Sequence, residues 1–374
     1  MKIAVLKERA AGETRVAATP ETAKKFIGLG NEVAVESGAG DAASITDSAY
    51  AEAGATTGDA ASCVKDADIV LGVQAPDVAL LKGAKPGAWV AALFDPFQSR
   101  ERLEAYAKAG FEALSMEFMP RITRAQSMDV LSSQSNLAGY KAVVTAADEY
   151  GRAFPMMMTA AGTVQAARCF VMGVGVAGLQ AIATAKRLGA QVSATDVRSA
   201  TKEQIESLGA KAIFVEDVEG IEGEGSGGYA TEMSDEYKAA QAKLVSEHIA
   251  KQDLVITTAL IPGRAAPVLI TDEQIATMKP GSVIFDLAVA QGGNVEGSKP
   301  DEIVVKHGVK IMGYSNTPAH LPADASALFA RNHFNFLSAF WDKEAGKPEL
   351  DEEIGDAVRL TKGGEIVNER LKGA

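Results

Sequence analysis

The segment "RCFVMGVGVAGLQAIATAKRLGA", residues 168–190, decides the fold class of this 374-residue chain. An apolar run leads into the pattern G-x-G-x-x-G, and residues with helical spacing follow. Gly173 allows a tight turn, Gly175 lets the backbone approach a pyrophosphate, and Gly178 brings helix close to strand. The uncharged stretch is at the short limit for a membrane span, but the glycines favour a strand, a turn and a helix. The segment predicts a dinucleotide-binding turn; the alternative is a glycine turn in an α/β domain that binds no nucleotide.

An acidic residue follows at the separation that this motif expects. Asp196 ends the next predicted strand, "QVSATD". A carboxylate there accepts hydrogen bonds from the adenosine ribose and repels a 2'-phosphate, so NAD(H) is the predicted cofactor. Arg198 can in principle favour NADP instead. The residues expected to line the cofactor are Gly173, Val174, Gly175, Val176, Gly178, Asp196, Val197 and Arg198.

Apolar runs alternate with helical patterns along the chain, which indicates α/β architecture with parallel sheets and helices on both faces. We expect two Rossmann-like domains with a nucleotide cleft between them. Residues 1–136 plus 320–374 are the predicted N-terminal domain, completed by C-terminal helices, and residues 137–319 the predicted NAD(H)-binding domain. A helix from Tyr140 to about Phe154 is expected to carry the chain between them.

Two later turns also follow predicted strands. "TTALIPG" (residues 257–263) and "DLAVAQGGN" (residues 286–294) should lie at the carboxyl edge of the sheet, where ligands bind. Thr258, Ala259 and Leu260 are expected to contact the nucleotide, although each segment can equally be an ordinary strand-to-helix turn. The acidic, glycine-rich residues 216–237 predict a long loop, either a functional lid or a disordered segment.

Composition excludes several classes of partner. The net charge of −12 argues against nucleic acid and anionic lipid as direct partners. Cys63 and Cys169 give neither a disulfide framework nor metal-ligand spacing, so we expect no metal and a reducing compartment. The N-terminus lacks the pattern of a signal peptide, and we expect no membrane span.

Few residues suit proton transfer. A dehydrogenase acting on an alcohol, amine or keto acid needs a positioned acid or base, commonly His or Lys. His248, His307 and His333 are expected on the surface or in packing, and His320 in a loop that can line a cleft. The polar segment "PRITRAQSMDVLSSQSNLAGY", residues 120–140, contains neither His nor Lys; the alternative to a functional role is a polar interdomain turn.

The chain resembles the NAD(H)-binding domain I, or alpha-subunit part, of proton-translocating nicotinamide nucleotide transhydrogenases, whose fold is shared with alanine dehydrogenase. The resemblance covers nearly the whole chain. It is carried by "KERAAGETRVAATP", "PRITRAQSMD", "SSQSNLAGY", "GVGVAGLQAIATAKRLGA", "TTALIPG" and "MKPGSVIFDLA".

The resemblance assigns roles by position. It implies that residues in the polar segment position the nicotinamide and its ribose: Arg121, Gln126, Asp129 and Ser132. It implies that Tyr229, in the acidic loop, closes over bound nucleotide and that Asp196 contacts the adenosine ribose. Alanine dehydrogenases share an arginine matching Arg15, but their lysine matches Gln74 and their histidine falls near Leu93. Hydride transfer between two nicotinamide rings involves no proton, so it needs neither.

The expected function is therefore hydride transfer between NADH on this chain and NADP+ on a partner subunit, coupled to proton translocation. The resemblance implies a homodimer that docks on NADP(H)-binding domain III and membrane domain II, in the cytoplasm at the inner face of the cell membrane. One alternative is an amino-acid dehydrogenase of the alanine dehydrogenase type. Another is a non-catalytic NAD(H) sensor.

Overall fold

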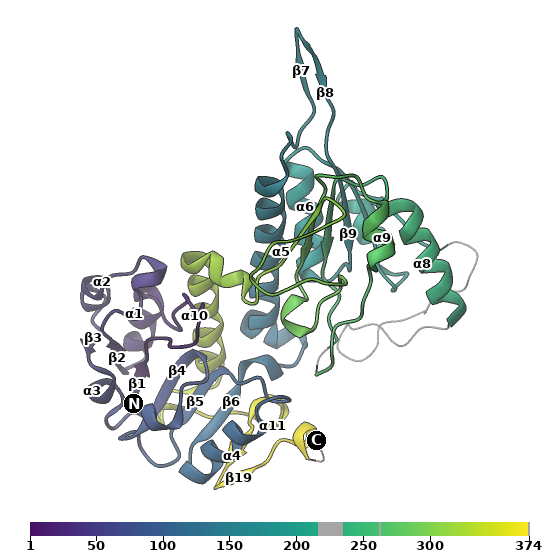
Figure 1. The fold of residues 1–374 in the computed structure, drawn as a ribbon. Coiled ribbons are helices and arrows are strands. Elements are labelled where there is room, and N and C mark those ends of the chain that lie inside the picture. Colours follow the sequence, from purple (N-terminus) through teal and green to yellow (C-terminus); the bar gives the residue numbers. More distant parts are fainter. Residues whose placement is uncertain (216–234, 262, 373–374) are drawn as a thin grey trace. The chain divides into compact units, whose positions relative to one another are not determined.

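A computed structural model describes residues 1–215, 235–261 and 263–372. The chain forms two compact units. Unit 1 contains Met1–Gln134 and Ala319–Ala374, and unit 2 contains Ser135–Pro318. Each unit is built on its own sheet (Figure 1).

Unit 1 is built on a six-stranded, all-parallel sheet in the order β3-β2-β1-β4-β5-β6. The strands are β1 (Lys2–Val5), β2 (Glu32–Glu36), β3 (Thr56–Gly58), β4 (Ile69–Gln74), β5 (Trp89–Leu93) and β6 (Glu112–Ser115). Alternate side chains of β1 enter opposite cores: Ile3 and Val5 pack in one, and Ala4 in the other. Both faces are buried, which is why these strands are nearly continuous apolar runs.

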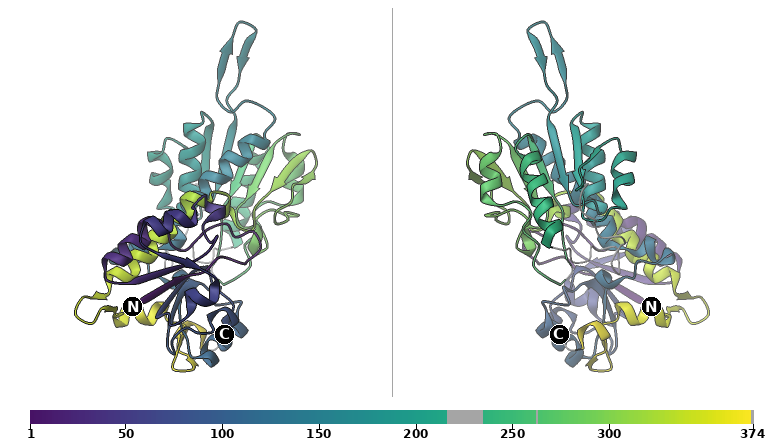
Figure 2. Two further views of the ribbon diagram at one scale, coloured as in Figure 1. Left: turned by 90° about the vertical axis from the view of Figure 1, so that its left-hand side faces the viewer. Right: turned by 90° about the vertical axis from the view of Figure 1, so that its right-hand side faces the viewer.

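Helices and short hairpins cover this sheet. The helices are α1 (Pro20–Gly28), α2 (Asp47–Glu52), α3 (Ala60–Val64), α4 (Arg100–Ala109), α10 (Pro322–Ala339) and α11 (Glu352–Val358). The C-terminal segment also forms the hairpins β16 (Trp341–Asp342) with β17 (Lys347–Pro348) and β18 (Thr361–Lys362) with β19 (Glu365–Ile366). Helix α10 lies beside α1, where the rings of Phe26 and Phe334 meet edge to face at 5.2 Å (Figure 2). The C-terminal segment is therefore an integral part of the unit 1 core.

Unit 2 is built on a seven-stranded sheet in the order β11-β10-β9-β12-β13-β15-β14, parallel except for β14. The strands are β9 (Arg168–Met172), β10 (Gln191–Thr195), β11 (Lys211–Ala212), β12 (Leu254–Thr257), β13 (Val283–Asp286), β14 (Val304–Lys306) and β15 (Val309–Met312). Helices α5 (Val130–Glu149), α6 (Val176–Arg187), α7 (Thr201–Ser207), α8 (Asp235–Ile249) and α9 (Asp272–Thr277) accompany them. The strand order reverses between β9 and β12, which is the place where Rossmann folds bind dinucleotides.

Helix α5 differs from the sequence prediction. It begins at Val130 and ends at Glu149, not at Tyr140 and Phe154. The polar segment is therefore largely helical, because a 3-10 helix at Thr123–Met128 precedes α5. Asp129 caps α5: its carboxylate accepts the Ser132 N–H at 3.0 Å and the Ser132 hydroxyl at 2.6 Å. An acid at this position satisfies amides that have no partner within the helix.

A hairpin of β7 (Met157–Thr159) and β8 (Gly162–Val164) extends from unit 2, as both views of Figure 2 show. The side chains of Met156, Met157 and Met158 are 60%, 43% and 81% exposed. This hairpin was not predicted from the sequence, since strands of only three residues give little periodic signal.

The remaining ordered turns are 3-10 helices at Asp41–Ala43, Val78–Leu81, Met116–Phe118, Val289–Gln291, Thr317–His320 and Glu369–Leu371. The predicted α/β class with parallel, Rossmann-like sheets is confirmed. Within the described residues, no helix is long and apolar enough to cross a membrane.

Candidate functional site

The glycine turn in unit 2 has the geometry that the motif predicts. Gly173 follows β9 with φ +96°, a conformation that L-residues with side chains rarely adopt. A Cβ added at Gly178 would lie 1.9 Å from the Gly173 carbonyl oxygen, so only glycine fits where α6 packs on the turn. A Cβ at Gly175 would meet open space. The turn is thus closed at its base and open at its tip.

The tip leads directly into α6, which begins at Val176 with Gly175 as its N-cap. Among the described residues, no side chain caps this helix end. Gly175 and Val176 are exposed, while Val174 is buried. Amides at a helix start and the positive end of a helix dipole favour an anion, so the turn fits the pyrophosphate of a dinucleotide.

Asp196 lies beside this turn. Its buried carboxylate accepts the Val174 N–H at 2.7 Å. It also accepts hydrogen bonds from the Arg198 backbone N–H (2.9 Å) and from the Arg198 guanidinium, at 2.9 and 3.0 Å. Val197 is half-buried between them. Because the charge of Arg198 is paired with Asp196, a 2'-phosphate would have to compete with that carboxylate.

The segment after β12 meets the same turn from the other side. β12 pairs directly with β9, and the Thr258 hydroxyl donates to the Gly173 carbonyl at 3.0 Å. Ala259 is half-buried and Leu260 is 37% exposed. Unit 2 therefore brings together the glycine turn, Asp196 and residues 258–260. Tyr229 lies outside the described residues.

The polar segment belongs to unit 1 up to Gln134. Arg121 and Gln126 are exposed, and Asp129 and Ser132 are half-buried and bonded to each other, as expected for residues that a ligand can reach. The segment thus presents two exposed side chains and one fixed acid–hydroxyl pair.

Residues that the sequence pattern does not indicate hold this segment in place. The side-chain amides of Asn332 and Asn335 donate to the Ser127 carbonyl at 2.9 and 3.1 Å. Arg124 pairs with Asp351 and Glu353, both at 2.5 Å. These partners are more than 200 residues away in sequence, so no local pattern indicates them.

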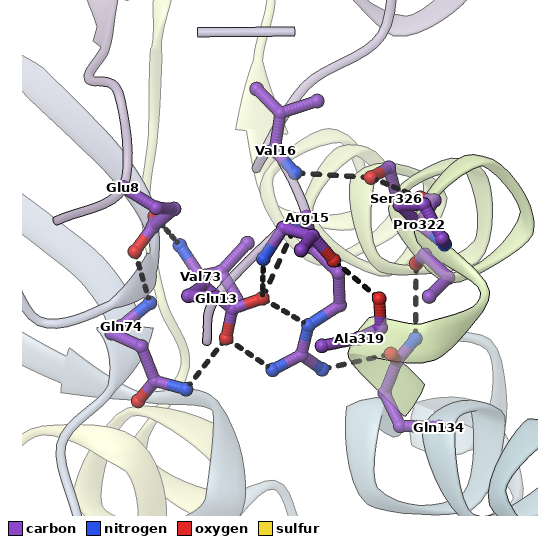
Figure 3. Close-up of polar contacts among 12 residues, drawn as sticks. Glu8, Glu13, Arg15, Val16, Val73, Gln74, Gln134, Ala319, Pro322 and Ser326 are labelled. Carbon is purple, nitrogen blue, oxygen red and sulfur yellow. Dashed lines mark hydrogen bonds and ion pairs between the residues drawn. The ribbon is translucent and has the colours of Figure 1, made fainter. Parts of the chain in front are cut away.

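Unit 1 also contains a buried polar cluster after β1 (Figure 3). Arg15 donates to both oxygens of Glu13, at 2.7 and 2.6 Å, and to Gln134 at 2.9 Å. Gln74 donates to Glu13 at 3.0 Å, and Gln74 and Leu93 are paired across β4 and β5. The two positions where alanine dehydrogenases carry lysine and histidine thus lie next to each other, with an amide and an alkyl group.

Two carboxyl groups of this cluster have opposite pKa shifts. Burial raises the pKa of Glu8 to about 7, against the N–H groups of Val73 and Gln74, which it accepts at 2.6 and 3.2 Å. The pKa of Glu13 is lowered overall: burial raises it, but hydrogen bonds and charge from Arg15 outweigh that effect. Glu13 is therefore the ionised partner of Arg15.

The histidines lie away from the glycine turn in their contacts. His248 bonds Ser193 at 2.8 Å, and His307 bonds Asp272 at 3.2 Å. His333 is fully buried against the Ala17 carbonyl, and its pKa is lowered to about 4 by burial. His320 is exposed at the end of a 3-10 helix. Within the described residues, no group of three or more His, Cys, Asp or Glu side chains suits a metal ion.

The fold and the glycine turn define a two-domain protein of the Rossmann class. The chain belongs to the alanine dehydrogenase/PNT family: the N-terminal domain of that family matches residues 4–138 and its C-terminal domain residues 142–369. This confirms the family resemblance deduced from the motifs.

Individual relatives narrow the likeness. The first portion of NAD(P) transhydrogenase subunit alpha, a separate chain in Rhodospirillum rubrum, is 55% identical over 384 residues, covering 100% of this chain and 99% of the relative. The crystal structure of transhydrogenase from Sinorhizobium meliloti has a TM-score of 0.90 at 52% identity, covering 98% of this chain and 100% of that one. An L-alanine dehydrogenase structure has a TM-score of 0.81 at 24% identity over 100% and 98% of the two chains, which shows a shared fold.

Proposed function

We propose that this chain is the NAD(H)-binding subunit of a proton-translocating transhydrogenase. Hydride passes between NADH on this chain and NADP+ on a partner subunit, and the transfer is coupled to proton translocation. The observation that carries the proposal is the glycine turn of unit 2, open at its tip and backed by Asp196, in a chain that matches a transhydrogenase alpha subunit along its whole length.

In this proposal, unit 2 holds the dinucleotide. The amides at Gly175 and Val176 bind the pyrophosphate, and the carboxylate of Asp196 binds the adenosine ribose once Arg198 shares or leaves it. Residues 258–260 line the nicotinamide side of the turn. When bound, NAD(H) itself supplies the hydride or accepts it; the chain supplies binding and orientation.

Unit 1 supplies positioning groups. Arg121, Gln126, Asp129 and Ser132 are proposed to orient the nicotinamide and its ribose. Asp129 and Ser132 already bond each other at the start of α5, so their oxygens are fixed before a ligand arrives. Orientation of this kind can supply a large part of a transfer barrier.

The cluster around Arg15 favours this function over an amino-acid dehydrogenase. An amino acid or keto acid would need a cation for its carboxylate, but both oxygens of Glu13 engage the Arg15 guanidinium. It would also need a proton-transfer group, and Gln74 and Leu93 cannot titrate. Hydride exchange between two nicotinamides requires neither.

The proposed partners are a second copy of this chain, an NADP(H)-binding domain III and a membrane domain II, with the chain at the cytoplasmic face of the membrane. The methionines of the β7–β8 hairpin support the homodimer, because exposed apolar groups on a projecting hairpin are typical of a protein contact. Size measurement of the purified chain, with and without residues 156–164, tests the dimer.

The deciding experiment measures hydride transfer from NADH to an NADP+ analogue. The purified chain is assayed alone and mixed with an NADP-binding transhydrogenase domain, beside alanine plus NAD+. Rapid transfer only in the mixture, with no turnover of alanine, supports the proposal. Turnover of alanine by the chain alone would replace it with the dehydrogenase, and nucleotide binding without any transfer in the mixture would favour the sensor.

A further inference from the structure

We propose that Asn294 is a positioning residue, which holds residues 258–260 in place for the nicotinamide half of NAD(H). This inference rests on the proposed function, because it assumes that unit 2 binds the dinucleotide at its glycine turn. It predicts that Asn294 controls affinity for the whole dinucleotide but not for its adenosine half.

Every polar atom of the Asn294 side chain is used to join two limbs of one loop. Its carbonyl oxygen accepts the Ala259 N–H at 3.0 Å. Its amide donates to the Ala259 carbonyl and to the Pro267 carbonyl, both at 2.8 Å. The outgoing limb at Ala259 and the returning limb at Pro267 are thus tied to one fully buried side chain.

The backbone of Asn294 fixes that side chain in turn. Its carbonyl accepts the N–H groups of Leu269 and Ile270, at 2.7 and 3.0 Å. Its own N–H donates to the carboxylate of Asp286 at 2.9 Å. Asp286, at the end of β13, is fully buried and also accepts from Val295 (3.2 Å) and Ser298 (2.8 Å). The anchor is therefore built into the core of unit 2.

The strand order shows which half of the ligand this anchor serves. Asp196, the proposed ribose ligand, follows β10 on one side of β9, while residues 258–260 follow β12 on the other. A dinucleotide that crosses the switch point has its adenosine half on the β10 side and its nicotinamide half on the β12 side. Asn294 lies behind the second half.

The segment is held from both directions. Thr258 bonds the glycine turn, and Ala259 has both backbone polar groups bonded to Asn294. Ala259 is therefore an anchor point, and Leu260 is the side chain that the anchor presents, 37% exposed. A segment ordered before binding loses less entropy when the ligand arrives, which strengthens binding.

The test compares binding of NADH and of ADP to the intact chain, by calorimetry, for the wild type, Asn294→Ala and Asn294→Asp. The aspartate variant keeps the shape and the acceptor for Ala259 but loses both donors, and it supplies the same comparison if the alanine variant unfolds. Gln252→Ala is the matched control: its buried amide bonds His248 just before the opposite end of β12. We expect the Asn294 variants to raise the Kd for NADH about tenfold and leave that for ADP within about twofold.

The outcomes separate this inference from the function beneath it. Equal weakening of NADH and ADP, or the same loss in Gln252→Ala, would mean a general loss of fold and would overturn the positioning role. Unchanged NADH binding in both Asn294 variants would overturn it as well. If the wild type binds ADP and NADH with no gain from the nicotinamide half, the inference fails while nucleotide binding stands; if it binds neither, the proposed function fails too.

Discussion

The two sheets of this chain share the order of their first five strands but differ at their carboxyl edges. In unit 1, Glu36 at the end of β2 accepts the Lys7 N–H at 2.8 Å and pairs with Arg9. In unit 2, Asp196 after β10 accepts the Val174 N–H at 2.7 Å and pairs with Arg198. The same topological position thus carries an acid, a backbone amide and an arginine in both units.

The residues after the first strand of each sheet make the difference. In unit 1, further glutamates close the edge: Glu8 accepts amides at the end of β4, and Glu117 accepts the Phe94 and Asp95 N–H groups at the end of β5, both at 2.7 Å. In unit 2, glycines leave the start of α6 without a side-chain cap from the described residues. Topology gives both sheets a place for a ligand, but the turn of unit 2 adds open space and backbone donors.

The largest expected effect breaks the closed edge of unit 1. Glu13→Ala leaves Arg15 buried without its ionised partner, so the free energy of unfolding of unit 1 should fall by about 3–5 kcal/mol. Both tryptophans, Trp89 and Trp341, belong to unit 1, so urea unfolding followed by tryptophan fluorescence measures it. NADH binding by folded protein should not change.

Glu21→Ala is the control for this change. Glu21 pairs with Lys25 and Arg331 on the surface, where such contacts contribute about 0–1 kcal/mol. Equal losses in the two variants would show that the Arg15 pair contributes no more than a surface pair, and that unit 1 is not held by its buried charges.

A pH series sharpens the same contrast. Burial raises the pKa of Glu8 to about 7, while an unfolded glutamate titrates near 4.5. Between these values the folded chain keeps a proton that the unfolded chain releases, so the stability that the protonated form provides is lost as pH rises. Relative to Glu8→Gln, the wild type should lose up to about 3 kcal/mol between about pH 4.5 and pH 8.

Urea midpoints for the two proteins at pH values from about 5 to about 8 test this, again by tryptophan fluorescence. The groups that face Glu8 are the amides of Val73 and Gln74 and the side chains of Glu13 and Arg15. Glu13 and Arg15 are present in both proteins, so the difference isolates Glu8. A constant difference across the series would mean that Glu8 is ionised in the fold throughout that range.

The sequence was informative where one residue's own geometry decides the structure. Gly173 and Gly178 are required by a positive φ and by a backbone contact, and both requirements are local to the motif. Asp196 follows from its spacing to the glycines. The start of α5 was missed because Asp129 and Ser132 resemble polar loop residues, although Asp followed three residues later by Ser is also a capping pattern.

Long-range partners could not be predicted in the same way. Asn294 lies 35 residues from Ala259, and the turn that contains it looks like any strand-to-helix connection. Glu8 reaches Val73 across 65 residues, and Asn332 reaches Ser127 across 205. These contacts depend on which strands become neighbours, and the glutamates that close unit 1 have no spacing that distinguishes them from surface charges.

The smallest expected effect on stability separates the two edges most directly. Gly178→Ala places a methyl group 1.9 Å from the Gly173 carbonyl oxygen, so the turn must open. Overpacking of this kind costs about 1–3 kcal/mol, and the displaced amides should raise the Kd for NADH by more than about tenfold. In unit 1, Gly40→Ala makes a similar clash, 2.6 Å from the Ile45 carbonyl oxygen.

Gly40→Ala should destabilise unit 1 by a similar amount, since it too forces a methyl group against backbone. Its Kd for NADH should stay within about twofold of the wild type, because no residue of the glycine turn moves. Thermal unfolding and NADH titration of both variants give the comparison. If Gly40→Ala weakened NADH as much as Gly178→Ala, the open edge of unit 2 would not be what binds the nucleotide, and the contrast between the two sheets would lose its functional meaning.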